Sequence, residues 1–286
     1  MGKMTNNYLK QAPLSFVGQK RNFVKHYVKV LNENIPGDGE GWTIVDAFGG
    51  SGLLSHVSKR IKPKARVIYN DFDNYAERIA NIESTERLRV KLLKCCEGVG
   101  KNDKLSVEVK SEVVDAIKMH GDFVDWLSVS AWLKFAGSSA VYNVEDLASQ
   151  NILYNRIRQS PIVCAMDYFD GVEKVKADFK SLLNEHKGNN KALFVLDPPY
   201  ICTDQAKYTN EWYFDLIDFL DLADIVRAPF VLFSSSKSEI LKFIDWSEKT
   251  GKYKELHNPK SVSIKGVVNG QSRYTDNMLY KFKAIS

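Results

Sequence analysis

The chain between Trp42 and Ile61, WTIVDAFGGSGLLSHVSKRI, joins a strand pattern to a helical pattern through a glycine-rich turn. Trp42 to Phe48 is an apolar run with β-branched residues, and Leu53 to Ile61 has helical periodicity. Glycines at such a junction let the backbone approach a ligand, and the start of the helix offers free N–H groups. The turn has neither GxGxxG spacing nor a phosphate-loop lysine, so a nucleotide-like ligand and a plain turn are equally supported.

Similar apolar runs recur along the chain and alternate with helical patterns. The further expected strands are Arg66 to Asp71, Pro161 to Met166, Ala192 to Asp197 and Pro229 to Ser234, with 262–264 and 277–282 as a late hairpin. Helical periodicity marks a segment from about Asn74, residues 172–183 and residues 212–226. This alternation predicts an α/β fold with a doubly wound, mostly parallel sheet, in which ligands lie at the carboxyl ends of the strands.

Residues 82–160 interrupt the alternation. They hold a cluster of basic residues between Arg87 and Lys94 and an aromatic segment between Trp126 and Tyr142. We expect a smaller, mainly helical insert here, and a main domain formed by residues 1–81 and 161–286.

Composition limits the classes of protein that fit. The 286 residues carry a net charge of +5, which is compatible with a polyanionic partner but does not demonstrate one. Four cysteines without CxxC or His/Cys spacing indicate reduced thiols and no metal site. There is no apolar leader and no run long enough to cross a membrane. We therefore expect a cytoplasmic protein without a membrane partner.

Acidic residues follow two of the predicted strands. Asp71 ends the second strand, where an acid hydrogen-bonds the ribose of an adenosine cofactor, although a helix N-cap is the alternative. Asp167, Tyr168 and Phe169 follow the third predicted strand. An acid and an aromatic ring there fit the adenine of such a cofactor, and a cap followed by core aromatics fits equally well.

Asp197-Pro198-Pro199-Tyr200 follows the buried run ALFVL and is the most specific motif in the chain. Two prolines stiffen the turn and leave carbonyl acceptors without competing N–H donors. The Asp197 carboxylate and the Pro198 carbonyl can accept from an aromatic amine, whose lone pair then becomes available to an electrophilic methyl group, while Tyr200 stacks on the ring. The alternative, a Pro-Pro-Tyr ligand of a WW domain, requires an exposed, disordered tract and not a position after a buried strand.

Taken in order, these motifs resemble those of the D12 class of adenine-specific DNA methyltransferases, the Dam-type group of bacteria and phages. Phe16 to Arg21 is similar to the N-terminal cofactor motif, with Gln19 in place of its second glycine. Arg273 to Tyr280 resembles the C-terminal strand that closes the sheet, and Phe233-Ser234-Ser235 lacks an Asn often found after the serine. Neither departure affects the amine acceptors, and the resemblance covers nearly the whole chain.

The resemblance implies a class I methyltransferase fold that uses S-adenosylmethionine, yields S-adenosylhomocysteine and needs no metal. The implied catalytic residues are Asp197, Pro198, Pro199 and Tyr200. The implied cofactor-binding residues are Phe16, Gly18, Lys20, Asp46, Phe48, Gly50, Gly52, Asp71, Asp167 and Tyr168. Arg21, Lys207, Tyr208 and Asn210 are expected to contact DNA.

The expected reaction is methyl transfer to the N6 amine of an adenine flipped out of double-stranded DNA, with residues 82–160 as the target-recognition insert. Asp197 argues against cytosine N4, where Ser is more usual at this position. Methylation of RNA adenine or of a glutamine side chain, and a non-catalytic DNA-binding protein on a methyltransferase scaffold, are also compatible with the sequence. A cognate restriction endonuclease is a candidate partner, in a bacterium or in the host of a phage.

Overall fold

Strand β1 (Thr43–Asp46) pairs in parallel with β2 (Arg66–Asn70) on one side and with β4 (Ala192–Leu196) on the other. The other strands are β3 (Val172–Val175), β5 (Phe230–Ser235), β6 (Lys260–Asn269) and β7 (Ser272–Lys281). The seven strands lie in the order β3-β2-β1-β4-β5-β7-β6, and only the pairs that involve β7 are antiparallel. The predicted fold class, a doubly wound and mostly parallel sheet, is confirmed.

The structure, a computed structural model, describes residues 8–135, 139–199, 214–236, 238–269 and 272–282, with the backbone alone for 266–269 and 272–274. Within these ranges the chain forms two compact units. The sheet unit comprises residues 1–11, 19–73 and 169–286, and the helical unit comprises residues 12–18 and 74–168. The expected insert, 82–160, is therefore extended at both ends, and a short N-terminal segment joins it.

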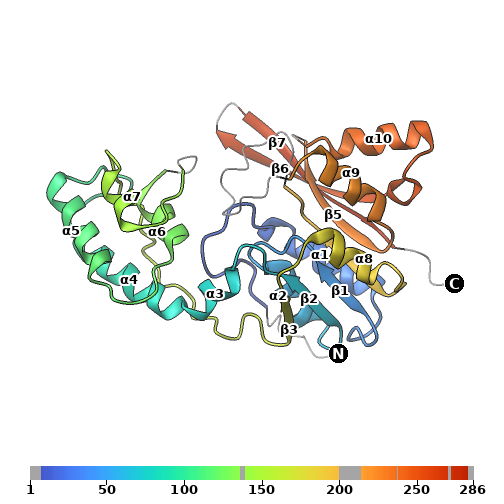
Figure 1. The fold of residues 1–286 in the computed structure, drawn as a ribbon, viewed down its shortest axis with the longest axis horizontal. Helices are drawn as coiled ribbons and strands as arrows, with labels where there is room; N and C mark the ends of the chain where they lie inside the picture. Colours follow the sequence, from blue (N-terminus) through green and yellow to red (C-terminus); the bar gives the residue numbers. More distant parts are fainter. Residues whose placement is uncertain (1–7, 136–138, 200–213, 237, 270–271, 283–286) are drawn as a thin grey trace. The chain divides into compact units, whose positions relative to one another are not determined.

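Each face of the sheet is covered by its own helices. One face packs against α8 (Phe179–His186), α9 (Leu216–Ile225) and α10 (Ile240–Thr250), with Phe194, Leu196 and Leu232 in a continuous apolar core (Figure 1). The other face bears α1 (Val24–Asn34) and α2 (Leu53–Ile61), which pack on each other. Because successive strand residues alternate between the two faces, Asp46 and Val45 project in opposite directions.

The helical unit contains α3 (Tyr75–Ala80), α4 (Ile82–Cys95), α5 (Val107–Lys118), α6 (Trp126–Leu133) and α7 (Val144–Ser149), as Figure 1 shows. A buried ion pair joins Arg78 of α3 to Asp125, the N-cap of α6, with nitrogen–oxygen distances of 2.8 and 3.0 Å. The Arg78 guanidinium also donates to the Ser15 carbonyl, and the Tyr75 hydroxyl bonds to the backbone of Leu14. These bonds explain why residues 12–18 belong to this unit.

Two expected elements are wrong. Residues 161–166 form no strand, and the third parallel strand is β3, within the segment expected to be helical from 172 to 183. In that segment only residues from Phe179 onward are helical, after Asp178 caps α8 through its side chain. The late hairpin is confirmed, with β6 and β7 longer than expected.

Across the described ranges, no helix has the length and apolar character needed to cross a membrane.

Candidate active site at the carboxyl ends of β1, β2 and β4

The site lies where the sheet changes its direction of winding. The chain leaves β1 toward α2 on one face of the sheet, whereas it leaves β4 toward α9 on the opposite face. In open α/β sheets this switch point leaves a crevice at the carboxyl ends of the strands, where ligands bind. The glycine turn, residues 49–52, follows β1, and Asp197-Pro198-Pro199 follows β4, so both motifs reach this point.

The glycine turn is held against two aromatic rings. Gly50 and Gly52 have φ values of 49° and 64°, which disfavour side chains. A Cβ at Gly52 would overlap the ring of Phe169, and one at Gly49 would overlap the ring of Tyr69. The two rings are stacked, with centroids 4.7 Å apart and planes at 13°. The turn therefore needs glycine to accommodate the stacked pair.

Asp71 is joined to the glycine turn through Tyr69. The Tyr69 hydroxyl lies 2.7 Å from the Gly50 carbonyl and 2.9 Å from the Asp71 carboxylate, so its single proton can be donated to either acceptor. The helix N-cap alternative for Asp71 is wrong, because Asn74 is the N-cap residue of α3. An acid beside a glycine turn at the ends of adjacent strands fits the ribose and the amino-acid part of S-adenosylmethionine.

Asn70 fixes the ends of three neighbouring strands. Its buried side-chain amide donates to the carbonyls of Ala47 and Ala177, at 3.0 and 2.9 Å, and its oxygen accepts from the Ala177 N–H at 3.0 Å. Ala47 follows β1 and Ala177 follows β3. A buried amide that satisfies three backbone groups positions the loops that carry the glycine turn and Asp71.

Asp197 accepts a strong, charged hydrogen bond. Its carboxylate lies 2.5 Å from the Lys20 ammonium, with 23% and 16% of the two side chains exposed. Burial raises the pKa of Asp197, and the charge and hydrogen bond of Lys20 oppose that rise. Lys20 precedes a 3-10 helix, η1 (Arg21–Phe23), whose Phe23 packs edge-on against Phe233 of β5. That contact fixes the position from which Lys20 reaches Asp197.

Asp46 is a second buried acid of the site. Its carboxylate accepts a 2.6 Å hydrogen bond from Ser55 of α2. Burial raises the pKa of Asp46 to about 7, the Ser55 hydrogen bond opposes this rise, and the negative charge of Asp197 adds to it. The effect of Asp197 shows that the two carboxyl groups are close enough to interact.

Several predicted site residues have other surroundings. Phe48 packs against Phe179 and Phe214 in the apolar layer, with ring centroids 5.1 and 5.9 Å apart. Phe16 and Tyr168 lie in the helical unit, where both contact Tyr75. Their roles toward a cofactor stay predictions.

The remaining predicted residues are either exposed or outside the described ranges. Gly18 has a φ of 84°, and Asp167 and Arg21 are exposed. Tyr200, Lys207, Tyr208 and Asn210 lie outside the described residues.

The sequence analysis named Phe169 only as an aromatic residue after a predicted strand and did not place its ring beside the glycine turn, and it missed Asp276. Asp276 lies on β7 directly opposite Ser235, the last residue of β5. Burial raises the pKa of Asp276, while the charge of Lys20 lowers it and that of Asp197 raises it. The strand pattern alone could not reveal this neighbour, because the register of an antiparallel strand depends on the fold.

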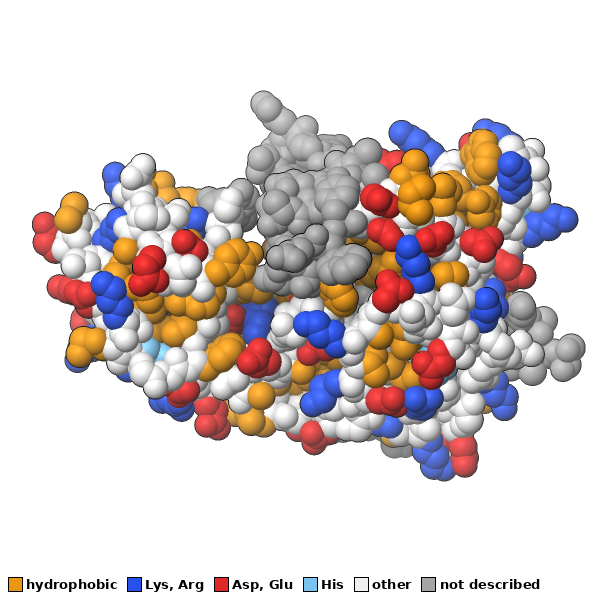
Figure 2. Space-filling model, viewed as in Figure 1, with side chains coloured by type: hydrophobic (Ala, Val, Ile, Leu, Met, Phe, Trp, Pro, Cys, Tyr) orange, Lys and Arg blue, Asp and Glu red, His pale blue; other side chains and the backbone are white. Residues whose placement is uncertain are grey.

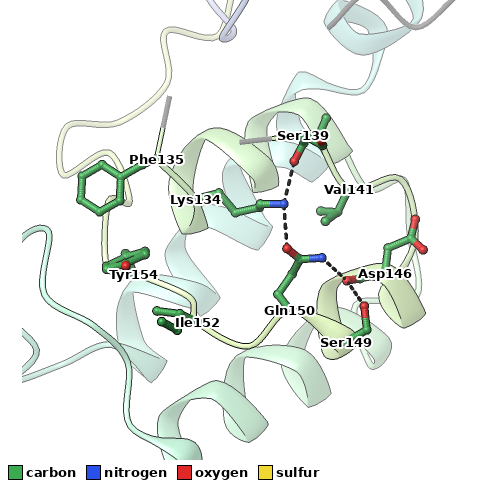
Figure 3. Close-up of a pocket in the computed structure, with 10 residues that line it drawn as sticks. Lys134, Phe135, Ser139, Val141, Asp146, Ser149, Gln150, Ile152 and Tyr154 are labelled. Carbon is green, nitrogen blue, oxygen red and sulfur yellow. Dashed lines mark hydrogen bonds between the residues drawn. The ribbon is translucent and has the colours of Figure 1, made fainter. Parts of the chain in front are cut away.

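The helical unit has a cavity of about 440 Å³ between α6 and α7 (Figure 3). Lys134 points into it and donates to the Ser139 carbonyl and the Gln150 side chain, while the rings of Phe135 and Tyr154 meet edge-on beside it. The guanidinium of Arg156 lies 4.7 Å from the centroid of the Phe135 ring. Cationic and aromatic side chains are thus gathered at one place.

Not every basic residue of the insert is available to a partner. Arg89 is buried and is held by Glu86 and by the carbonyls of Arg158 and Gln159, so it is structural. Lys91 and Lys94 are exposed. No group of three His, Cys, Asp or Glu side chains among the described residues is arranged to hold a metal ion.

The strand order, the glycine turn and the acid after β2 define a class I S-adenosylmethionine-dependent methyltransferase fold. Over 276 residues the chain is 45% identical to a Haemophilus influenzae protein named "Putative methyltransferase", and the match covers 96% of this chain and 93% of that protein. The chain therefore belongs to the same methyltransferase family.

No protein-family profile matches the chain. A precorrin-6y C5,15-methyltransferase from Geobacter metallireducens aligns over 96% of this chain and 99% of its own, with 9% identity and a TM-score of 0.35, too small a likeness to indicate a shared substrate.

Proposed function

We propose that the protein transfers a methyl group from S-adenosylmethionine to the N6 amine of an adenine in double-stranded DNA. One observation carries the proposal. The Asp197 carboxylate, beside the glycine turn and followed by two prolines, is placed to hold an N–H donor and already holds the ammonium of Lys20 at 2.5 Å. An amine of the substrate presents the same kind of N–H group to the same acceptor.

The chemistry follows from what this acceptor does to an aromatic amine. The lone pair of such an amine is delocalised into the ring, so the nitrogen is a weak nucleophile. The Asp197 carboxylate accepts one N–H and the Pro198 carbonyl accepts the other, which favours a tetrahedral nitrogen with its lone pair exposed. As the N–C bond forms, the methyl–sulfur bond breaks and its electron pair stays on the sulfur of the departing S-adenosylhomocysteine, and the nitrogen would lose one proton to the Asp197 carboxylate.

The residues at the ends of β1 and β2 fit the cofactor. Asp71 would accept from the ribose hydroxyls, and the glycine turn would receive the amino-acid part beside the N-terminus of α2. When bound, S-adenosylmethionine supplies an electrophilic methyl group on a positively charged sulfur. Holding the cofactor and the target amine together at the switch point would accelerate the reaction mainly by orienting the two reactants.

Adenine in a duplex is accessible only if it is flipped out of the stack, which costs a few kcal/mol. The helical unit is the proposed target-recognition unit, because its cavity gathers Lys134, Gln150 and two aromatic rings. Lysine and amide groups are donors suited to base edges in the major groove. Asp197, where cytosine-N4 enzymes more often have Ser, supports adenine as the target.

The test is methyl transfer from labelled S-adenosylmethionine to unmethylated duplex DNA, followed by nucleoside analysis of the product. We expect N6-methyladenine from the natural protein. Asp197→Ala should abolish transfer while calorimetry shows that S-adenosylmethionine still binds. Asp245→Asn, which removes an exposed carboxylate of α10, is the matched control and should remain active. N4-methylcytosine as the product, or turnover by Asp197→Ala, would overturn the proposal.

A further inference from the structure

Lys20 and Asp276 lie on the same face of the sheet. Directly opposite residues of an antiparallel pair project to one face, as do residues two apart along a strand. Phe233 is opposite Met278 and Ser235 is opposite Asp276, so Asp276 projects to the face that bears Phe233. The Lys20 ammonium lies 5.8 Å from the centroid of the Phe233 ring and is therefore on this face too.

The Lys20 ammonium thus shares this face of the sheet with a carboxylate on β7, and a second carboxylate, which follows β4, is its ion-pair partner. It forms an ion pair with Asp197, which follows β4. It also acts electrostatically on Asp276 of β7, and the Asp276 carboxyl responds to Asp197 as well. One cation therefore lies on the same face of the sheet as two partly buried carboxyl groups, only one of which belongs to the proposed amine site.

This arrangement creates a competition that the proposed reaction must resolve. The target amine needs the Asp197 oxygen that Lys20 occupies at 2.5 Å. Moving an ammonium away from its carboxylate in a partly buried place is costly unless another anion receives it. Asp276 is such an anion, and the four-carbon stem of lysine is flexible enough to exchange nearby acceptors.

We propose that Asp276 is a positioning residue, which receives the Lys20 ammonium when the target amine binds to Asp197. The inference rests on the proposed function, since it assigns a step of substrate binding to that same site. No bond is made or broken in this exchange. The ammonium passes from one carboxylate to another while the incoming amine takes the vacated acceptor, so the total charge of the site does not change.

The first test needs no substrate. In a crystal structure of Asp197→Asn the side chain at 197 keeps its shape but loses its charge, so we expect Lys20 to form its ion pair with Asp276. A Lys20 ammonium that remains on residue 197, or that points into solvent, would overturn the inference. This result is independent of which molecule the protein methylates.

The second test is a double-mutant cycle on methyl transfer. Asp276→Asn should raise KM for DNA about tenfold, the equivalent of about 1.4 kcal/mol, and should change kcat much less. In a Lys20→Met background the same substitution should have little further effect, because no ammonium remains to be received.

The two tests separate the possible failures. An equal rise in KM for Asp276→Asn in both backgrounds would show a merely structural role and would contradict the inference. Asp245→Asn controls for the loss of a carboxylate elsewhere in the protein. If Lys20 moves to Asp276 in the Asp197→Asn crystal but the natural protein leaves DNA unmethylated, the proposed function fails and the lysine exchange stands.

Discussion

At the scale of single residues, one ammonium influences the ionisation of three carboxyl groups at the site. Burial raises the pKa of Asp46, Asp197 and Asp276, and Lys20 lowers that of each. Without a nearby cation, carboxyl groups that raise one another's pKa bind protons more readily, and a protonated Asp197 would accept from an amine less well. Lys20 therefore has an electrostatic role even when its ammonium is not bonded to Asp197.

Asp46 should make the protein less stable as the pH rises toward neutrality. Its pKa is raised to about 7 in the folded protein, whereas an unfolded aspartate titrates near 3.9. Between these values the folded state binds a proton that the unfolded state lacks, so stability falls by up to about 1.4 kcal/mol per pH unit and levels off above pH 7. Urea unfolding at pH 5.5 and 7.5 measures the difference, which Asp46→Asn should reduce.

Ser55→Ala offers an independent check on this assignment. The Ser55 hydroxyl donates to the Asp46 carboxylate and opposes the rise in its pKa, so its removal should extend the loss of stability to higher pH. An Asp46→Asn protein with the same pH dependence as the natural one would show that another group is responsible.

At the scale of elements, the glycine turn is the feature that the sequence predicted best. The helix expected from Leu53 to Ile61 has those same bounds, and the strand before it is β1. The glycines in the motif indicated that another group packs closely against the backbone, but the sequence could not show which group this is. In the structure Phe169 and Tyr69 do, from segments far apart in the chain.

Gly52→Ala should weaken both the fold and the binding of S-adenosylmethionine. The φ of 64° costs about 1 kcal/mol for any residue with a side chain, and the new methyl group would displace the Phe169 ring. Gly251→Ala is the matched control, since φ is 71° there and a Cβ would meet nothing within 4 Å. Thermal melts and calorimetry should show a clearly larger effect at Gly52.

Equal effects of the two substitutions would mean that the contact with the Phe169 ring is unimportant. A second change, Phe169→Ala, should relieve the crowding at Gly52.

The error over the third strand has a physical cause. Residues 161–166 are apolar enough for a strand, but side chains of α4 bind the backbone there. Glu86 accepts from the Ile162 N–H, and Arg89 donates to the carbonyls of Arg158 and Gln159 just before it. The true strand, β3, is a short edge strand with two exposed residues among its four, so its apolar pattern is weak. Periodicity cannot detect either effect, because both depend on tertiary contacts.

The candidate site, like the fold, could be predicted only in part from the sequence. The two motifs after β1 and β4 came from the sequence, because each has a local pattern with a chemical meaning. The pairing of Lys20 with Asp197 and the nearness of Asp276 were not predictable, since they join positions that only the assembled sheet brings together.

At the scale of the whole molecule, the distribution of charge bears on any polyanionic partner. On the face shown in Figure 2, Lys and Arg side chains are interspersed with Asp and Glu over both units. Several insert cations are also neutralised locally, such as Arg87, which is paired with Asp122 at 2.5 Å. With a net charge of +5, the proposed binding to DNA should involve a limited number of phosphate contacts.

Binding to duplex DNA should weaken linearly on a plot of log affinity against log salt concentration. If Arg21, exposed on η1, is one of the phosphate contacts, Arg21→Ala should reduce the slope by about one without changing the affinity for S-adenosylmethionine. Fluorescence anisotropy at several salt concentrations measures both. Arg66→Ala is the control, because Arg66 is the first residue of β2, at the opposite end of the strand from the site, and pairs with Glu173. An unchanged slope for Arg21→Ala would remove it from the DNA surface.

The helical unit is assembled from two separate pieces of chain, and this affects any attempt to transplant it. Arg78 bonds to both Asp125 and the Ser15 carbonyl, and Tyr75 bonds to Leu14 in the buried interior of the unit. A graft of residues 74–168 alone would leave these buried donors without their N-terminal acceptors, which is costly for a guanidinium. Transferring this unit between relatives therefore requires moving residues 12–18 along with it.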